Sequence, residues 1–185
     1  MAGPLAVRRA ATVLRAGGLV AYPTEGVWGI GCDPLDPDAI ARLLLLKERP
    51  ASAGLILIAA DQEQLEPWLE RIEPALGRRL KAAWPGPVTW VLPAADWVPA
   101  WLTGGRPTLA VRVTAHAQSA ALCRAAGGPI VSTSANRRSR APAHAAVQVR
   151  RWFGDELDFI LGGATGGLRG PTEIRDANGR RLRAA

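Results

Sequence analysis

The chain has 185 residues and a formal net charge of +7, and this length favours one domain with a sizeable buried core. No apolar run is long enough to cross a membrane, and the arginines of the N-terminal segment argue against a secretory signal, so we expect a cytoplasmic protein. Two cysteines, Cys32 and Cys123, and two histidines are too few for a Cys/His metal cluster, and we expect both thiols to be reduced and buried.

The predicted elements alternate along the whole chain. Strands are expected at 18–22, 54–59, 88–92, 108–113, 129–132 and 158–161, with a last pair at 172–176 and 180–183. Helices are expected at 5–15, 37–46, 72–83, 115–126 and 143–153. Asp36 and Pro37 fit an N-cap and a first turn, and Gly17 and Gly127 fit helix ends. The alternation predicts an α/β fold and a single domain over residues 1–185.

The positive charge favours a polyanionic partner or substrate, such as a nucleotide, a phosphate or a nucleic acid. Lys47 and Lys81 are the only lysines, however, so a coding bias toward arginine explains the charge as well. The sequence contains no P-loop, no G-x-G-x-x-G after a strand, no G-x-S-x-G elbow and no H-E-x-x-H. If the protein handles a nucleotide, it does so without these common motifs.

Two stretches place polar groups near strand ends, where α/β proteins tend to bind ligands. In "YPTEGVWGIGCDP", Thr24 and Glu25 follow a strand and precede a glycine-rich turn, which indicates either a binding site or a loop that needs conformational freedom. In "LLLLKERP", Lys47 and Arg49 end a helix, where cations also complement the helix dipole.

Arg112 lies inside "TLAVRV", which otherwise reads as a buried strand. A guanidinium cannot be buried without compensation, so it either pairs with an acid or awaits an anionic ligand.

The stretch "IVSTSAN" ends a strand with hydroxyl side chains and an amide. In an extended backbone Ser132, Ser134 and Asn136 share one face, and Thr133 points to the other. Such neutral donors suit phosphate oxygens or a carboxylate, although they are also typical of a strand that ends in a turn. The seven tryptophans lie mostly in apolar contexts beside proline and indicate core packing more than base stacking.

The chain resembles the TsaC/YrdC family of threonylcarbamoyl-AMP synthases in its short bacterial form. The resemblance extends from about residue 5 to residue 183 and rests on an ordered set of motifs, which are "YPTEGVWGIGCDP", "LLLLKERP", "GLILIAA", "WPGPVTWVLPA", "WLTGG", "LAVRVTAH", "IVSTSAN" and "PTEIRDA". It implies a single YrdC-like domain, an α/β fold with a twisted mixed sheet and flanking helices around a positively charged concave cavity.

The resemblance also implies a reaction. L-threonine, bicarbonate or CO2 and ATP give threonylcarbamoyl-adenylate and pyrophosphate, with Mg2+ accompanying ATP. Partner proteins then transfer the threonylcarbamoyl group to the adenosine beside the anticodon of tRNA. Such chemistry needs anions held together and charge neutralised on the leaving group, which would explain why no histidine or carboxylate pair stands out.

Residue roles follow position by position from the resemblance. Threonine contacts are expected from Thr24, Arg112, Ser132 and Thr172. The basic pair Lys47 and Arg49 is expected to be catalytic and to contact the ATP phosphates. Further ATP contacts are expected from Thr108, Ser134, Asn136 and Arg183. No residue is expected to hold a resident metal.

Three positions depart from the family pattern. Ala53 and Gly54 stand where many relatives have a polar residue and a proline, Ser139 aligns with a frequent glycine, and Thr172 stands where serine is common. Two alternatives stay open. One is a non-catalytic protein that binds double-stranded RNA or tRNA during maturation, and the other is a carbamoyl-adenylate former like the related domain of HypF proteins.

Overall fold

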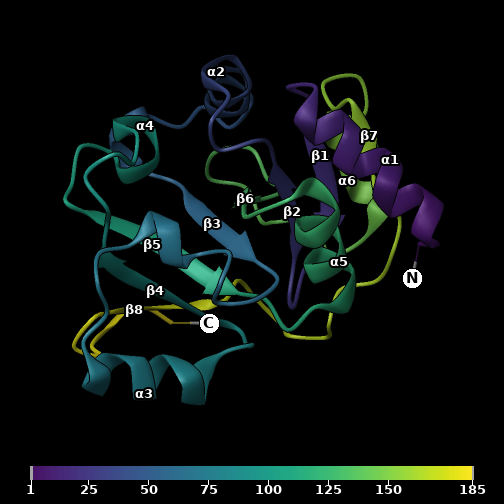
Figure 1. Cartoon of the computed structure of the whole chain (residues 1–185). Helices are drawn as coiled ribbons and strands as arrows, with labels where there is room; N and C mark the ends of the chain where they lie inside the picture. The colour runs from purple at the N-terminus through teal and green to yellow at the C-terminus, as the bar shows by residue number, and fades with distance from the viewer. Residues whose placement is uncertain (1, 185) are drawn as a thin grey trace.

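The computed structural model describes residues 2–184, so the first and last residues of the predicted domain lie outside it. Its strands are β1 (Val20–Pro23), β2 (Trp28–Gly31), β3 (Ile56–Ala59), β4 (Val88–Pro93), β5 (Thr108–Val113), β6 (Ile130–Ser134), β7 (Phe159–Ile160), β8 (Glu173–Asp176) and β9 (Arg181–Arg183). They form one sheet of nine strands in the order β7-β1-β2-β6-β3-β5-β4-β8-β9 (Figure 1). Three neighbouring pairs are parallel and five antiparallel, so the sheet is mixed, as the family resemblance implied.

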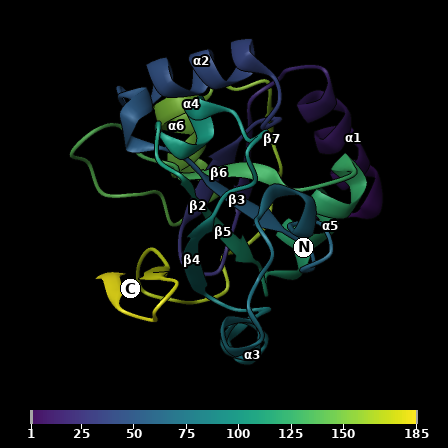
Figure 2. The ribbon, with the colours of Figure 1, turned by 60° about the vertical axis from the view of Figure 1, so that its left-hand side comes forward.

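Helices flank this sheet on both faces (Figure 2). They are α1 (Pro4–Arg15), α2 (Pro37–Leu46), α3 (Pro74–Ala83), α4 (Ala100–Thr103), α5 (Ala117–Ala126) and α6 (Ala146–Phe153), with short 3-10 turns at η1 (Ala51–Ala53) and η2 (Glu66–Trp68). The predicted cap of α2 is confirmed, because the Asp36 carboxylate accepts the backbone N–H groups of Asp38 and Ala39. Within residues 2–184 no helix has the length and apolar character to cross a bilayer.

The predicted α/β fold is confirmed, and each predicted strand and helix is present with bounds shifted by a few residues. The prediction of a glycine-rich turn after Glu25 was wrong. Residues Trp28–Gly31 form the strand β2, which pairs antiparallel with β1. Its glycines serve close packing between strands. A Cβ at Gly31 would lie 2.0 Å from the carbonyl oxygen of Val131 on the neighbouring chain segment. Glycine is therefore compatible with a strand at this position. The sequence analysis also missed the helix α4, because it is only four residues long.

Successive side chains of a strand point to opposite faces of the sheet and so contribute to two separate hydrophobic cores. Leu57 of β3 belongs to the larger core, which α2, α3 and α6 cover, whereas Ile58 belongs to the smaller core beneath α1 and α5. Both predicted free thiols are buried, Cys32 in the larger core and Cys123 in the smaller one. The short helix α4 adds Leu102 to the larger core, so four helices contribute to the core on one face of the sheet and two cover one end of the other face.

The remaining part of the second face positions the site. Ile58 of β3 and Ile130 of β6 point into the core beneath α1 and α5. Two residues along each strand on that same face, Ile56 and Ser132 pair across the sheet and line an open cavity. The cavity therefore lies on the part of this face that α1 and α5 leave uncovered. The ligand site was expected near the strand ends of the sheet, but the cavity lies over the face instead. Antiparallel neighbours do not bring all the carboxyl ends of the strands to one edge.

Two leucines of α2 provide a stability test with a matched control. Leu43 is fully buried in the larger core, whereas Leu45 is 82% exposed. We expect Leu43→Ala to lower the free energy of unfolding by about 3 kcal/mol, because it leaves a cavity, and Leu45→Ala to change it by less than about 0.5 kcal/mol. Urea unfolding measures both, and equal effects would contradict the packing described.

Candidate functional site

An open cavity of about 320 Å³ lies over β3, β5 and β6. Eight of the ten residues predicted for the site line it, and these are Thr24, Arg49, Thr108, Arg112, Ser132, Ser134, Thr172 and Arg183. They come from segments far apart in the chain, from the β1–β2 hairpin to β9. The sheet therefore brings most of the predicted residues together, and Lys47 and Asn136 lie outside the lining.

Four arginines surround the cavity, and among the described lining residues there is no Asp or Glu. Burial lowers the pKa of the Arg183 guanidinium, and the charges of Arg112 and Arg49 lower it further. Burial and the charge of Arg106 likewise lower the pKa of Arg49. Cations held this close repel one another in a poorly solvated space, so an anion in the cavity would stabilise all of them.

Arg106 was missed by the sequence-based prediction. It follows Gly104 and Gly105, which adopt left-handed backbone conformations between α4 and β5, and such a stretch reads as a solvated loop. Only the fold shows that this loop turns toward the cavity, where the Arg106 guanidinium donates to the carbonyl oxygen of Ser52 at 2.8 Å.

Arg112 is buried and pairs with an acid, the first of the two possibilities that the sequence left open. Its Nη2 donates to Oε2 of Glu25 at 3.1 Å, and its Nη1 donates to Oγ1 of Thr172 at 2.8 Å. The guanidinium also lines the cavity, and its buried Nε has no hydrogen-bond partner within residues 2–184. The protein therefore fixes the guanidinium through Glu25 and Thr172, while the residue forms part of the cavity wall.

Glu25 is held in turn by the segment after β5. Its Oε1 accepts from Oγ1 of Thr114 at 2.7 Å and from the backbone N–H of Ala115 at 3.1 Å. Both oxygens are therefore occupied, one toward β5 and the other toward Arg112. This fixed carboxylate sets the orientation of the arginine in the cavity wall.

Arg49 occupies another part of the lining and is held by backbone carbonyls. Its Nη2 donates to the oxygens of Gly54 at 2.8 Å and Ala53 at 3.2 Å. Gly54 has φ of +65°, a conformation that proline cannot adopt. The positive φ thus accounts for glycine at position 54, and nothing in the structure explains Ala53.

Lys47 points away from the cavity lining and braces the end of β6. Its Nζ donates to the carbonyl oxygen of Ser134 at 2.6 Å, to Oδ1 of Asn136 at 2.9 Å and to the carbonyl oxygen of Asn136. Burial lowers its pKa to about 8, with a smaller contribution from Arg49. Glu48 between the two cations has φ of +49°, and this left-handed residue lets Lys47 and Arg49 diverge.

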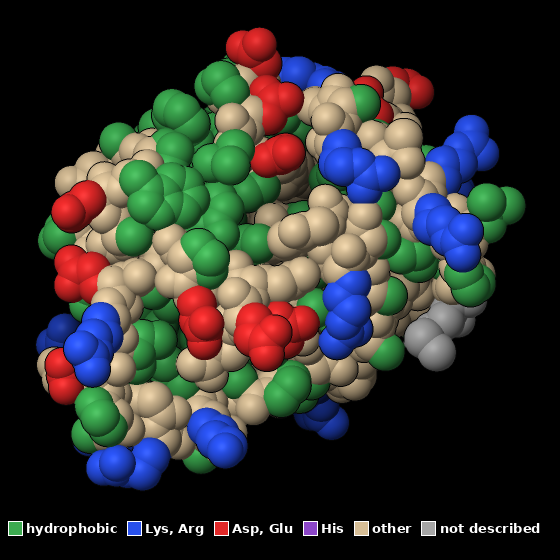
Figure 3. Space-filling model, viewed as in Figure 1, with side chains coloured by type: hydrophobic (Ala, Val, Ile, Leu, Met, Phe, Trp, Pro, Cys, Tyr) green, Lys and Arg blue, Asp and Glu red, His purple; other side chains and the backbone are tan. Residues whose placement is uncertain are grey.

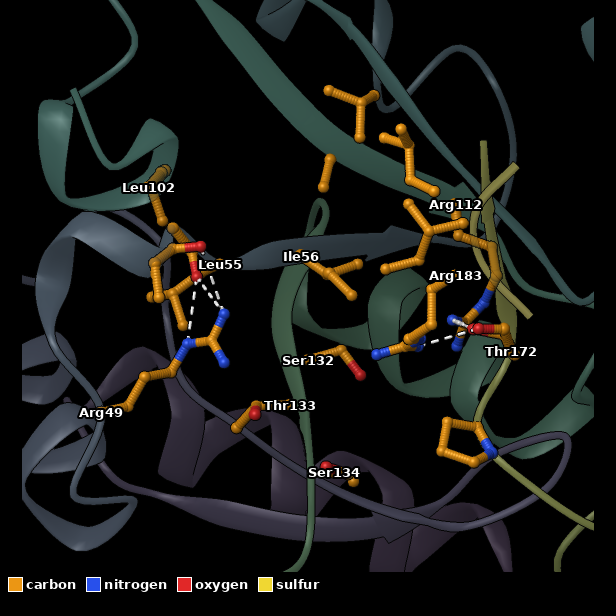
Figure 4. Close-up of a pocket in the computed structure, with 18 of the residues that line it drawn as sticks. Arg49, Leu55, Ile56, Leu102, Arg112, Ser132, Thr133, Ser134, Thr172 and Arg183 are labelled. Atoms are coloured by element: carbon orange, nitrogen blue, oxygen red, sulfur yellow. Dashed lines mark hydrogen bonds between the residues drawn. The ribbon is translucent and has the colours of Figure 1, made fainter. Parts of the chain in front are cut away.

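The close-up of the cavity shows Arg49 on one side, Arg112 and Arg183 on the other, and the end of β6 between them (Figure 4). Arg183 is tied to its side by Nη2, which donates to the carbonyl oxygen of Thr172 at 2.8 Å. Thr133 was expected to point to the opposite face from Ser132 and Ser134. It nevertheless belongs to the cavity lining, together with both serines. The arrangement offers two cationic ends joined by hydroxyl groups.

Two further features bear on the predicted site. No group of three or more His, Cys, Asp or Glu side chains between residues 2 and 184 is arranged to hold a metal ion. Ser139, in the arginine-rich loop after β6, has φ of +61°. Glycine adopts this conformation at least cost, which accounts for the glycine expected there in relatives.

Comparison with known proteins gives consistent matches over nearly the whole chain. Residues 12–185 match the Sua5, YciO and YrdC family, described as telomere recombination. The chain is 57% identical over 173 residues to the threonylcarbamoyl-AMP synthase of Halorhodospira halophila, covering 94% of this chain and 91% of that protein. It is 57% identical over 178 residues to the threonylcarbamoyl-AMP synthase of Nitrosococcus oceani, covering 96% of each.

A solved structure shares the fold. P. abyssi Sua5 complexed with L-threonine superimposes with a TM-score of 0.87 at 37% identity, over 94% of this chain and 51% of that chain. The present chain therefore spans about half the length of that protein.

The buried pair predicts a specific loss of stability. We expect Glu25→Gln to lower the free energy of unfolding by about 3 kcal/mol, because Arg112 would stay buried without a countercharge. Glu173→Gln serves as the control, since its partners Arg175 and Arg181 are partly exposed, and there we expect less than about 1 kcal/mol. Urea unfolding of the two variants compares them directly, and a Glu25→Gln protein as stable as Glu173→Gln would show that the pair does not organise the site.

Proposed function

We infer that this chain, which belongs to the Sua5, YciO and YrdC family, is a threonylcarbamoyl-AMP synthase. This inference rests on a cavity with two cationic ends, in a chain that is 57% identical to enzymes of that name. The substrates would be L-threonine, bicarbonate or CO2, and ATP, and the products threonylcarbamoyl-adenylate and pyrophosphate. The RNA-binding alternative is not favoured, because the relatives at this identity are named as enzymes.

The end formed by Arg112 would hold L-threonine. A guanidinium whose orientation is fixed by Glu25 and Thr172 suits a carboxylate. Thr24 and Ser132 lie in the same wall and would contact the polar groups of the amino acid. A relative with 37% identity has been solved in complex with L-threonine, which supports this proposal.

The end formed by Arg49 would hold the phosphates of ATP, with Arg106 added to the predicted set. Thr108 and Ser134 supply neutral donors nearby, and Arg183 faces the ligand from the opposite side. Mg2+ would enter with ATP, since phosphate oxygens are its preferred ligands and the cavity wall offers no carboxylate among its described residues. Its role would be to neutralise charge on the phosphates.

The chemistry then depends chiefly on placement. The threonine amine would attack CO2 to form a carbamate, with loss of the amine proton. A carbamate oxygen would attack the α-phosphorus of ATP, and the bond to the β-phosphate oxygen would break as pyrophosphate leaves. The arginines would hold the two anions within reach of each other and stabilise charge as it moves to the leaving group.

Lys47 and Asn136 would act indirectly. Their shared hydrogen bonds fix the end of β6, so they would keep Ser134 in position beside the phosphates. Downstream, we propose that partner proteins transfer the threonylcarbamoyl group to the adenosine beside the tRNA anticodon, with a direct contact to tRNA as a further possibility to test.

Pyrophosphate release tests the proposed function. Purified protein with Mg-ATP should release pyrophosphate only when both L-threonine and bicarbonate are present, and L-serine should compete weakly. Release without threonine, or no release from a folded protein that binds ATP, would contradict the proposal.

Two substitutions test the proposed ends of the cavity. We expect Arg49→Ala and Arg112→Ala each to lower kcat/KM by about 100-fold or more, as loss of a charge-stabilising donor does in other enzymes. Arg137→Ala is the control, because Arg137 lies outside the cavity in an exposed pair with Glu156, and its activity should stay within about twofold. Circular dichroism verifies that each variant is folded. Full activity in either cavity variant would remove that arginine from the site.

A further inference from the structure

A second surface of the molecule carries the opposite charge to the cavity. Three segments, 33–38, 61–70 and 94–101, contain eight of the chain's 16 acidic residues and none of its 23 lysines and arginines. We call these segments together the acidic face. Such a concentration is unusual in a protein with a net charge of +7.

The three segments form one continuous surface. Nε1 of Trp97 donates to the carbonyl oxygen of Pro67 at 2.9 Å, which joins 94–101 to 61–70. Nε1 of Trp101 donates to the carbonyl oxygen of Pro34 at 3.2 Å, which joins 94–101 to 33–38. A groove of about 350 Å³ has Asp33 and Glu63 among its lining residues, so the first two segments also meet there.

The carboxylates of the acidic face lack cationic partners within the described chain. None of the eight is in a salt bridge between residues 2 and 184, whereas five of the other acidic residues are. Four of the eight, Glu63, Glu66, Glu70 and Asp96, are exposed and make no side-chain hydrogen bond there. Like charges gathered without compensation repel one another, and a cationic partner would relieve that repulsion.

Apolar side chains lie among these charges. Leu35 is 53% exposed and Trp97 is 51% exposed, and the ring of Trp97 packs against Trp68 with the centroids 4.7 Å apart. In the space-filling view, hydrophobic side chains gather on one part of the surface, with Asp and Glu side chains around them (Figure 3). The groove beside them is lined by Pro34, Leu35, Pro67 and Trp68, and its single described basic residue, Arg15, donates to the carbonyl oxygen of Ala125.

We propose that the acidic face is a docking surface for a partner protein that presents a basic segment with an apolar anchor. The exposed aromatic and aliphatic groups would bury the anchor, and the unpaired carboxylates would select and steer the basic segment. The same charge repels nucleic acid, so a protein is the occupant that fits. The face also adjoins the cavity, since α4 contributes Trp101 to it and Leu102 and Thr103 to the cavity lining. A docked protein would sit one helix away from the site.

The test uses a synthetic amphipathic peptide with lysine on one face and leucine on the other. The indole N–H resonance of Trp97, one of seven tryptophans, reports binding by NMR. Two control peptides separate the contributions, one with glutamate replacing lysine and one with serine replacing leucine. We expect the Lys/Leu peptide to shift the Trp97 resonance and to bind at least fivefold more weakly to Asp96→Lys, with an affinity that falls as salt rises.

A matched variant controls for net charge. Asp155 is exposed and outside the acidic face, so Asp155→Lys changes the charge equally and should leave the peptide affinity unchanged. Pyrophosphate release should be unchanged in Asp96→Lys, which separates this proposal from the proposed function. Equal weakening in both variants, equal binding of the glutamate peptide or the serine peptide, or a dimer in sedimentation that Asp96→Lys dissociates would each overturn the proposal.

Discussion

The buried ion pair of Arg112 and Glu25 is the interaction on which the cavity depends. Glu25 comes from the hairpin turn between β1 and β2, Arg112 from β5, and Thr172, which accepts from the same guanidinium, from the segment before β8. The pair therefore ties together three parts of the sheet that are distant in the sequence. A buried guanidinium is costly unless it is compensated, and Glu25 supplies that compensation without entering the cavity lining. The result is an oriented cation in the cavity wall.

The charged residues of the chain are divided between two parts of the surface. Around the cavity, burial and neighbouring arginines lower the pKa of Arg49 and Arg183. Backbone carbonyls hold Arg49, Arg106 and Arg183, so among the described residues Arg112 alone of the four pairs with a carboxylate. Half of the acidic residues lie instead on a face where no basic residue occurs in the contributing segments. The chain thus keeps a site for anions and a surface for cations apart, although they share α4. Functional charges of this kind reduce stability when no ligand is bound, and the buried cores must offset that cost.

The fold was largely predictable because apolar periodicity and helix caps act locally, as at Asp36. β2 was not, because Gly29 and Gly31 lower strand propensity, and the reason for them is the close approach of neighbouring strands. In the site, Arg112 stood out as a charge in a buried strand, whereas Arg106 looked like any loop residue. Lys47 is held by Ser134 and Asn136 at the end of β6, long-range contacts that no sequence pattern indicated. Local signals therefore predicted elements, and long-range packing decided which side chains share the cavity.

In the proposed reaction, one cavity brings carbamoylated threonine and ATP together for adenylate transfer. Incubating the protein with Mg-ATP, L-threonine and 13C-labelled bicarbonate, followed by rapid quenching and mass spectrometry, tests it most directly. We expect an adenylate that contains threonine and one labelled carbon, formed in step with pyrophosphate. An adenylate without the label, or labelled carbamate with no adenylate, would contradict it.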